Sequence, residues 1–399
     1  MPTHTRFDSA PNMPRRIALA SLLGLATMAL SARAEYCPQP GQWLALKPEV
    51  RIESHADLLR SASRQRVVLL GEQHDSAPHH TWQLHTLAAL YTLQPRMVIG
   101  FESFPRALQS TLDRWVAGNL TESEFLQQTQ WGTTWGFDAA LYMPLFQFAR
   151  MHRIPMRALN VERELVRRVG ESGWAQIPAA DRQGIGDPAP ATAPYLDILR
   201  RAYIAHGRPG VDAAKLDDPG FRRFVDGMLL WDRAMAEALA QPVLRDGAKL
   251  AVAIVGRGHV EYGHGIARQL ASLGIVDIAA LLPWETGDSC APPSANIADA
   301  VFGLRASTST PNGPRLDVEL SPSEGAEGVA VIRVMPGGIA EQTGVLAGDV
   351  IRRVAGRQVA TVQDVIGAIR RQAPGTWLPL MVMRDGSALE LVAKFPPQP

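Results

Sequence analysis

The stretch VVLLGEQHDSAPHHTWQLH, at residues 67–85, decides the fold of this chain. Four apolar residues lead into a glycine, and a glutamate and four histidines follow within fifteen positions. An unbroken apolar run predicts a strand that is buried on both faces, as in a parallel sheet covered by helices. The apolar spacing over residues 80–93 then predicts a helix. The stretch therefore predicts a buried strand whose carboxyl end carries residues that bind metals or transfer protons.

The same pattern recurs along the chain. Further apolar runs predict buried strands at residues 97–101, 155–159, 250–255 and 276–282. Helical patterns lie between them, at residues 141–152, 221–239 and 262–273. Strands that alternate with helices imply a mostly parallel sheet with helices on both faces. We therefore expect an α/β domain over residues 40–287.

An insertion interrupts this order between residues 161 and 245. Its helical patterns surround the segment GIGDPAPATAP at residues 184–194. In a compact domain, a segment of this composition is more often a lid or a surface excursion than part of the core. We expect a mostly helical subdomain over the edge of the sheet.

The last quarter of the chain has a different pattern. Residues 288–299 have the composition of a linker, and short β-rich runs follow, with a hairpin turn at Asp385-Gly386. Residues 300–396 resemble a PDZ domain of the bacterial protease-associated type. The positions that carry this resemblance are Gly344, Ala347-Gly348-Asp349, Gly356 and Arg384-Asp385-Gly386. The resemblance implies a small β-rich domain that binds peptides.

Length and charge limit the function classes. With 399 residues the chain exceeds what one hydrophobic core usually supports, so two folded units are expected. The formal net charge of +1 and the lack of a basic run argue against nucleic acid as a partner.

The N-terminal segment is typical of an export signal. Arg15 and Arg16 precede an apolar run at residues 17–30, which ends in the small-x-small pattern Ala32-Arg33-Ala34. Because spanning a bilayer takes ~20 residues, the run predicts a signal peptide over residues 1–34 that is cleaved near Ala34. The residues before Cys37 do not form a lipidation site. We expect a periplasmic protein without a membrane anchor.

The chain has two cysteines, Cys37 and Cys290. Export places both in an oxidising compartment, where disulfides form and persist. We expect a disulfide that joins the start of the mature protein to the end of the first domain, and two free thiols are the alternative.

Three predicted strands end in chemically active residues. The first leads to Glu72 and His74, the second to Glu102, and the fourth to His259. Parallel strands point the same way, so these side chains should lie on one rim of the sheet, where such folds bind ligands. Two histidines and two carboxylates there suit a divalent first-row metal or a proton-transfer site.

The first domain resembles a known family in six segments. They are LGEQHDSAPHH, GFESFPRALQ, WGFDAALYMPLFQFAR, IPMRALN, LLWDRAMAEAL and VGRGHVEYGHGI, which are similar in order and spacing to the ChaN-type haem-binding domain of the Tiki and TraB superfamily. The superfamily signature falls here on Gly71 with His74, on Glu102, and on Gly256 with His259. The ChaN branch implies haem binding and iron handling, whereas Tiki relatives imply metal-dependent proteolysis. ChaN is a lipoprotein, and this chain departs from it by lacking a lipidation site and carrying a PDZ domain.

Haem binding, our first hypothesis, needs an axial ligand in an apolar slot. The candidate ligands near the rim are His80, Tyr142, Tyr262 and His264, and flat walls are offered by Trp82, Trp131 and Trp135. A buried tyrosine or tryptophan is also ordinary core packing, which is the alternative for Tyr142. We expect His79 and His85 to be solvated helix positions. Two copies that hold haem between them would make a homodimer, a possibility that the sequence leaves open.

A metal-dependent hydrolase is the second hypothesis. His74, Glu102 and His259 would bind Mn, Co or Zn, and Glu72 would act as the general base toward metal-bound water. The alternative for Glu72 is a structural one, in which it caps the following helix and pairs with Arg257 or Arg163. The spacing differs from the H-E-x-x-H of helical zinc proteases, which excludes that chemistry.

A PDZ adaptor is a third role, compatible with either of the others. We expect the strand with Gly328, Val329 and Val331 to accept a peptide C-terminus as an added strand. Val362, Val365 and Ile369, on a helix over residues 361–371, would supply an apolar pocket. For these three side chains ordinary core packing is the alternative.

Overall fold

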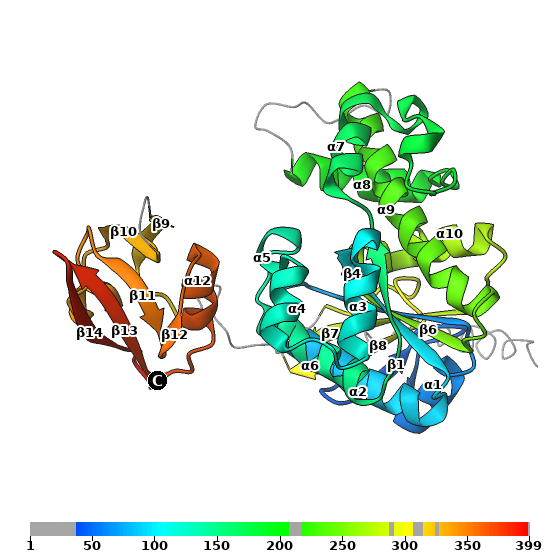
Figure 1. Ribbon diagram of the computed structural model, residues 1–399. Helices are drawn as coiled ribbons and strands as arrows, with labels where there is room; N and C mark the ends of the chain where they lie inside the picture. Colours follow the sequence, from blue (N-terminus) through cyan, green and yellow to red (C-terminus); the bar gives the residue numbers. More distant parts are fainter. Residues whose placement is uncertain (1–36, 207–217, 287–290, 306–313, 324–326, 398–399) are drawn as a thin grey trace, which may run out of the picture.

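The computed structural model describes residues 37–206, 218–286, 291–305, 314–323 and 327–397. Two sheets organise these residues (Figure 1). The predicted signal peptide and Cys290 lie outside the described residues. Cys37 is disulfide-bonded. Within the described parts of the chain, no helix is both long and apolar enough to cross a membrane.

The first sheet has eight strands in the order β2-β1-β8-β7-β3-β6-β4-β5. Their bounds are β1 (Trp43–Ala45), β2 (Arg51–Glu53), β3 (Val67–Glu72), β4 (Met97–Pro105), β5 (Met156–Asn160), β6 (Leu250–Gly256), β7 (Ile278–Thr286) and β8 (Ala300–Arg305). All neighbours from β8 to β5 are parallel, whereas β1 is antiparallel to both β8 and β2. The predicted α/β fold with a mostly parallel sheet is therefore confirmed.

Helices cover both faces of this sheet. One face carries α1 (His55–Ala62), α2 (Ala77–Leu93), the 3₁₀ turn η1 (Arg106–Leu108), α3 (Gln109–Val116), α4 (Glu122–Gln128), α5 (Trp131–Thr134) and α6 (Ala139–Met151). The other carries part of α9 (Pro219–Leu244) and α10 (Ile266–Ser272), which follows η4 (Arg257–His259) and η5 (Glu261–Gly263). Val68 and Leu70 enter the first core, and Val67 and Leu69 enter the second, all fully buried. This two-sided burial explains the unbroken apolar run of β3.

The insertion is helical, as expected. It contains α7 (Arg163–Ser172), η2 (Trp174–Gln176), η3 (Ala179–Asp181), α8 (Ala193–His206) and the first part of α9. Two small apolar clusters hold it together. The 26-residue α9 begins with Asp218 as its N-cap and runs from these clusters into the main core. One rigid helix therefore joins the insertion to the sheet.

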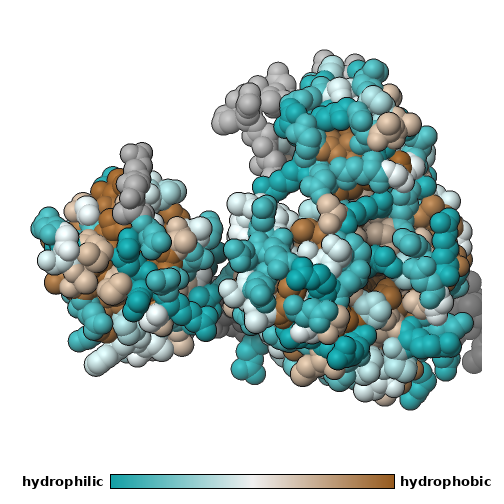
Figure 2. Space-filling model, in the orientation of Figure 1, coloured by the Kyte–Doolittle hydropathy of each residue, from teal (hydrophilic) through white to brown (hydrophobic). Residues whose placement is uncertain are grey.

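The second sheet has the order β14-β13-β11-β10-β9, with β12 beside β11. Its strands are β9 (Val318–Pro322), β10 (Val329–Val334), β11 (Val350–Val354), β12 (Arg357–Gln358), β13 (Trp377–Arg384) and β14 (Ser387–Lys394). Two helices, α11 (Ile339–Thr343) and α12 (Val362–Arg370), complete a separate apolar core. This confirms the β-rich second domain. On the face drawn in Figure 2, hydrophilic residues cover most of both domains, and apolar residues show in small patches.

The boundary between the sheets differs from the expected domain boundary. We expected residues 300–305 in the second domain, but β8 pairs with β7 and β1 in the first sheet. Ala300 and Val301 are fully buried in the first domain. Burying these apolar side chains stabilises the strand there, whereas a linker would leave them in water. The second sheet begins only at Val318.

Candidate functional site

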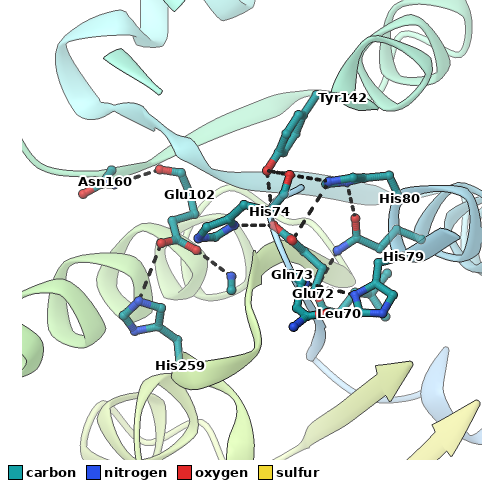
Figure 3. A network of polar contacts seen from close by, with 12 residues as sticks. Leu70, Glu72, Gln73, His74, His79, His80, Glu102, Tyr142, Asn160 and His259 are labelled. Carbon is teal, nitrogen blue, oxygen red and sulfur yellow. Dashed lines mark hydrogen bonds and ion pairs between the residues drawn. The ribbon is translucent and has the colours of Figure 1, made fainter. Parts of the chain in front are cut away.

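The carboxyl ends of β3, β4 and β6 bring the strand-end residues to one rim of the sheet (Figure 3). Glu72 is the last residue of β3 and stands in register with Gly256, the last residue of β6. Glu102 lies in β4, on the other side of β6. A Cβ atom on Gly256 would lie 3.0 Å from His74 Cε1 and 3.5 Å from Glu102 Oε2. The glycine therefore lets these two side chains approach the backbone of β6.

Glu72 and His74 form a close pair. His74 Nδ1 lies 2.7 Å from Glu72 Oε1, and the hydroxyl of Tyr142 donates to the same oxygen at 3.3 Å. Burial alone would lower the pKa of His74, but the hydrogen bond to Glu72 and the charge of Glu102 raise it above its usual value. Glu72 itself is 2% exposed, and its Oε2 has no hydrogen-bond partner among the described residues.

Glu72 does not take the structural roles considered above. Arg257 pairs with Glu261 at 2.6 Å, and Arg163 donates to the carbonyl of Thr134 at 3.0 Å. Pro78 occupies the first turn of α2, which favours helix initiation without a carboxylate cap. The carboxylate of Glu72 instead orients His74.

The imidazole of His74 is accessible. Its side chain is 29% exposed, whereas that of Glu72 is 1% exposed. The rings of Trp135 and Phe137 lie 4.7 and 5.0 Å from the His74 ring, centroid to centroid, and both are partly buried. His74 Nε2 has no hydrogen bond within the described parts of the chain. This nitrogen therefore keeps its electron pair or proton available for a ligand that reaches the exposed part of the side chain.

Glu102 and His259 form the second half of the rim. The backbone N–H of Gly256 donates to Glu102 Oε2 at 2.6 Å, and His259 Nε2 lies 3.6 Å from Glu102 Oε1. The amide of Asn160 donates to the Glu102 carbonyl at 2.9 Å and holds the strand end in place. Carboxylates and imidazoles therefore alternate along the rim, from Glu72 through His74 and Glu102 to His259.

Asp232 extends this row and was missed by the sequence analysis. His259 Nδ1 lies 2.7 Å from Asp232 Oδ1, and the hydroxyl of Tyr195 donates to Asp232 Oδ2 at 2.7 Å. Burial opposes the charged form of His259, but Glu102 and the hydrogen bond to Asp232 outweigh it and raise the pKa of His259 to about 9. The sequence signal was weak, because Asp232 in LLWDRAMAEAL is one of several charged residues of α9, with Arg233 and Glu237 close by.

His80 and Tyr142 are buried residues that contact the backbone of His74. They are 3% and 1% exposed, and their rings pack at 4.2 Å. His80 Nε2 and the Tyr142 hydroxyl both contact the carbonyl of His74, at 3.2 and 3.3 Å. Burial raises the pKa of Tyr142 well above its usual value, so its hydroxyl stays protonated. Neither residue is exposed as a haem ligand in this conformation.

Tyr262 and His264 form a separate aromatic pair. Their rings are stacked at 6.1 Å with planes 22° apart, and both residues are partly exposed. His264 also contacts Tyr195 at 5.8 Å. Tyr262 has a left-handed backbone with φ 59°, which is strained for a tyrosine. The contacts of this pair lead toward Asp232 and not toward His74.

Two of the three tryptophans that we expected near the ligand lie in the core, and one lies at the site. Trp82 packs against Trp43 at 6.1 Å, and Trp131 packs against Tyr142 at 5.2 Å, both nearly buried. These two residues belong to the apolar core beneath the rim. Trp135 alone among the three expected residues contacts the ring of a strand-end histidine.

The burial of His79 contradicts our expectation from the sequence. We expected it to be solvated, but it is 1% exposed, and its Nδ1 accepts the backbone N–H of Gln73 at 3.0 Å. Burial and the nearby charge of Arg257 lower the pKa of His79 to about 4. The neutral ring therefore holds the loop between β3 and α2. His85 is exposed, as expected.

The metal hypothesis gains no support from the arrangement. Among the residues that the structure describes, no group of three or more His, Cys, Asp or Glu side chains is arranged to hold a metal ion. Glu102 Oε2 is occupied by the N–H of Gly256, and His259 Nδ1 by Asp232. His74, Glu102 and His259 thus share a rim through hydrogen bonds and ion-pair contacts.

The strand that we expected to bind a peptide is not at an edge of the second sheet; the neighbouring strand β9 is. We expected the strand with Gly328, Val329 and Val331 to accept a peptide. This strand, β10, pairs with β9 on one side and with β11 on the other, so both its edges are occupied. A Cβ atom on Gly328 would lie 2.6 Å from the carbonyl oxygen of Ile351, which shows how closely β11 covers it. The outer strands of this sheet are β9 and β14, and β9 is the one next to β10.

The helix α12 packs beside β9. Val365 and Ile369 are buried in the core of the second domain, so ordinary core packing accounts for both. Val362 is only partly buried and packs against that core. A groove wall on α12 would therefore start from Val362.

One ion pair joins the two domains. Arg371, which follows α12, donates to Asp138 Oδ2 at 2.7 Å. The other carboxylate oxygen of Asp138 accepts the backbone N–H of Ala140 and caps α6, the helix that carries Tyr142. In Figure 1, α12 is the element of the second domain that faces α4 and α5.

Comparisons with known proteins agree with this architecture. The family described as haem-binding uptake, Tiki superfamily, ChaN matches residues 58–270, and the PDZ domain family matches residues 310–394. No curated protein sequence matches the chain.

Three solved structures are similar to parts of this chain. A structure describing cofacial haem binding to ChaN of Campylobacter jejuni is 15% identical, covers 65% of this chain and 95% of its own, and has a TM-score of 0.48. The HtrA-type protease AlgW with a decapeptide is 24% identical, with a TM-score of 0.20, and the match covers 21% of this chain and 29% of that protease. A serine endoprotease from Yersinia pestis is 24% identical over 21% of this chain and 30% of its own, with a TM-score of 0.17. Because the ChaN match spans more than half of its residues, this chain belongs to the ChaN family of haem-binding uptake proteins in the Tiki superfamily.

Proposed function

We propose that the protein binds haem at the rim around His74 and serves haem or iron handling in the periplasm, with the PDZ domain recruiting a protein partner. The observation that carries the proposal is the accessible imidazole of His74. Its Nδ1 is held by Glu72 at 2.7 Å, its Nε2 makes no hydrogen bond to the described residues, and Trp135 and Phe137 flank its ring. An imidazole held by a carboxylate in an apolar setting fits an axial haem ligand.

The surrounding residues fit a flat, apolar ligand. The rings of Trp135 and Phe137 lie beside the His74 ring, and His80 and Tyr142 contact the backbone carbonyl of His74. Glu72 orients the imidazole and strengthens its Nε2 as an electron-pair donor. A bound haem would supply a redox-active, Lewis-acidic iron at this nitrogen.

A haemin titration of the mature protein tests this proposal. We expect a shifted Soret band that is lost in His74→Ala and retained in His85→Ala, which removes an exposed histidine from α2. A Soret band that survives His74→Ala but disappears in Tyr262→Phe or His264→Ala would move the ligand to the stacked aromatic pair. Sedimentation of the haem-loaded protein shows whether two copies share the ligand.

The second module is proposed to bind a peptide C-terminus along β9. The outer position of β9 and the neighbouring helix α12 support this, because an added strand needs an unpaired edge beside a groove wall. A library of C-terminal peptides panned on the full-length protein tests it. Val362→Glu should abolish capture, and Arg370→Ala, an exposed position on α12, should retain it. Capture that survives Val362→Glu would contradict the groove.

A hydrolase is the second candidate. The alternation of carboxylates and imidazoles along the rim, with the pKa of both His74 and His259 raised, favours proton transfer. Metal analysis of the protein as isolated separates the candidates. Stoichiometric manganese, cobalt or zinc that is lost in His74→Ala, together with no haemin response, would favour the hydrolase.

The periplasmic location is part of the proposal. It rests on the N-terminal pattern of residues 1–34 and on the disulfide bond of Cys37. Fractionation of cells that express the full chain, followed by N-terminal sequencing, should find the protein in the periplasm with its first residue near Glu35. Recovery of an unprocessed chain in the cytoplasm would contradict it.

A further inference from the structure

Asp232 is a fully buried carboxylate on a helix whose neighbouring buried positions are apolar. It lies in α9, is 0% exposed, and has the buried Met235 and Ala236 one turn further along the helix. A buried carboxylate is strongly unfavourable unless its oxygens are hydrogen-bonded. The role of Asp232 must therefore be sought in the groups that hydrogen-bond to its carboxylate.

Both oxygens of Asp232 have a specific partner. Oδ1 lies 2.7 Å from His259 Nδ1, and Oδ2 accepts the hydroxyl of Tyr195 at 2.7 Å. Tyr195 is 1% exposed and His259 is 9% exposed, so neither hydrogen bond competes with bulk water. Short hydrogen bonds to a charged, buried carboxylate are the stronger kind.

These bonds set the direction of the His259 ring. Because Nδ1 donates to Asp232, Nε2 points the other way, toward Glu102 Oε1 at 3.6 Å. Trp231 lies edge-on to the ring, with the planes 89° apart and the centroids 6.3 Å apart. The ring is thus fixed at one end by a carboxylate and presents its other nitrogen to the rim.

The backbone at Gly265 leaves room for the contact between Asp232 and His259. A Cβ atom on Gly265 would lie 2.8 Å from Asp232 Oδ1 and 2.6 Å from the carbonyl oxygen of His259. Any side chain at position 265 would therefore push the two residues apart. Three separate segments, α9, the turns after β6 and α8, close on this one carboxylate.

The third segment comes from the helical insertion. Tyr195 lies in α8 and packs with Phe221 and Val225 of α9 in the apolar cluster of the insertion. Its hydroxyl is the polar contact that this cluster makes with the Asp232 carboxylate. The hydroxyl of Tyr195 therefore links the insertion to the rim.

We infer that Asp232 is a positioning residue for the rim, holding His259 with Nε2 toward Glu102, and that Tyr195 makes the helical insertion part of the ligand site. The inference rests on the proposed function in so far as the rim binds the ligand. The position of His259 is a property of the protein without ligand. The two can be tested separately.

Nuclear magnetic resonance of the full-length mature protein with ¹⁵N-labelled histidine tests the contact. The Nδ1–H of His259 should give a far-downfield proton signal, typical of an imidazole hydrogen-bonded to a carboxylate, which is absent in His259→Gln. Asp232→Asn should remove or strongly shift this signal, because the amide is a weaker acceptor. Asp226→Asn is the matched control, since Asp226 lies on the same helix and accepts the backbone N–H of Trp174 instead.

Haemin titration of the same variants tests the role in the site. Loss of an outer partner of a metal-ligating histidine typically weakens metal affinity about 10–100-fold. His259 acts on the rim through Glu102 and is not the proposed ligand, so we expect a loss of about tenfold, the lower end of that range, for Asp232→Asn, about threefold for Tyr195→Phe, and none for Asp226→Asn. Tyr195→Phe keeps the inference testable if Asp232→Asn does not fold.

Two outcomes would overturn the inference. The first is a His259 signal that is unchanged in Asp232→Asn and in Tyr195→Phe. The second is unchanged haemin affinity in both variants although the signal has moved. If the wild-type protein does not respond to haemin at all, the proposed function fails, while the magnetic resonance result still decides whether Asp232 positions His259.

Discussion

Arg371 at the end of the PDZ helix α12 donates a 2.7 Å hydrogen bond to Asp138, the residue that caps α6 in the haem-binding domain. Gly367 allows this approach, because a Cβ atom there would lie 3.4 Å from Asp138 Oδ2 and 3.3 Å from Arg371 Nη1. Glycine in a helix interior costs about 1 kcal/mol relative to alanine. The contact therefore combines an ion pair with a glycine that leaves room for it.

We predict that Arg371→Ala loosens the docking of the two domains. An exposed ion pair contributes less than about 1 kcal/mol, so the docked form should become less populated without loss of either fold. Pulsed electron paramagnetic resonance between spin labels at the exposed positions Gln363 and Glu122 should show a broader distance distribution. The neighbouring Arg370→Ala should leave the distribution unchanged, and an identical broadening in both variants would contradict the prediction.

Substitution of Asp138 separates its two roles. Asp138→Asn keeps an N-cap oxygen for α6 and removes the charge, so it should match Arg371→Ala. Asp138→Ala also removes the cap, at about 1 kcal/mol, and should additionally speed hydrogen exchange in the first turn of α6. Equal exchange in both variants would show that the cap contributes nothing to α6.

Gly256 should be more important for the site than for the fold. Its backbone, with φ −60° and ψ 139°, accepts alanine, but the new methyl group would lie 3.0 Å from His74 Cε1. We predict that Gly256→Ala displaces His74 and weakens haemin binding about tenfold, with a change in the free energy of unfolding below about 1 kcal/mol. Haemin titration and urea unfolding measure the two effects.

Two other glycines provide the comparison for Gly256→Ala. Gly258→Ala meets no atom within 4 Å and should leave both measurements unchanged. Gly71→Ala would clash with Leu282 Cδ2 and lie 3.1 Å from the backbone of Arg257, so it should destabilise the fold by about 1–3 kcal/mol. If Gly258→Ala weakens haemin binding as much as Gly256→Ala, the steric argument fails.

The buried His79 should make the protein sensitive to mild acid. Its pKa is about 4 in the folded protein and near 6.5 when the chain unfolds, so the unfolded state takes up the proton first as the pH falls. The stability associated with the neutral ring is complete above pH 6.5 and is lost progressively toward pH 4. Between pH 7 and pH 5 the loss should be on the order of 2 kcal/mol.

Urea unfolding at pH 7 and pH 5 checks this prediction. His79→Asn offers an oxygen to the N–H of Gln73 and does not titrate, so its stability should fall less between the two pH values than that of the wild type. His85→Asn, which removes an exposed histidine from the same helix, should keep the wild-type dependence. A wild-type dependence in His79→Asn would mean that other groups cause the acid sensitivity.

The parts of the fold that could be predicted are the buried strands, because most of them are runs of apolar residues in the sequence. β3, β6 and the first halves of β4 and β7 are apolar on both faces, and their sequence shows this directly, whereas β5 also carries Arg157. β1 and β2 have three residues each, too few for a periodic signal. The edge position of β9 depends on which strands pair, and pairing is set by tertiary contacts that no single segment encodes.

The site could be predicted in part for the same reason. Glu72, His74, Glu102 and His259 follow strands, and the geometry of a parallel sheet brings strand ends together. Asp232 comes from the middle of a helix, and only the packing of α9 against the sheet carries it to the rim. The burial of His79 likewise depends on how α2 packs, since its sequence position next to His80 carries no sign of it.

β8 ties the two ends of the haem-binding domain together, because it pairs with β1 near the start of the described chain and with β7. A protein cut at residue 287, where the composition marks a linker, would leave β1 and β2 without their neighbour and expose the edge of β7. An exposed β-edge invites aggregation. During synthesis, the sheet of the first domain is completed only once residue 305 has emerged, so this domain depends on a segment that lies directly before the PDZ domain.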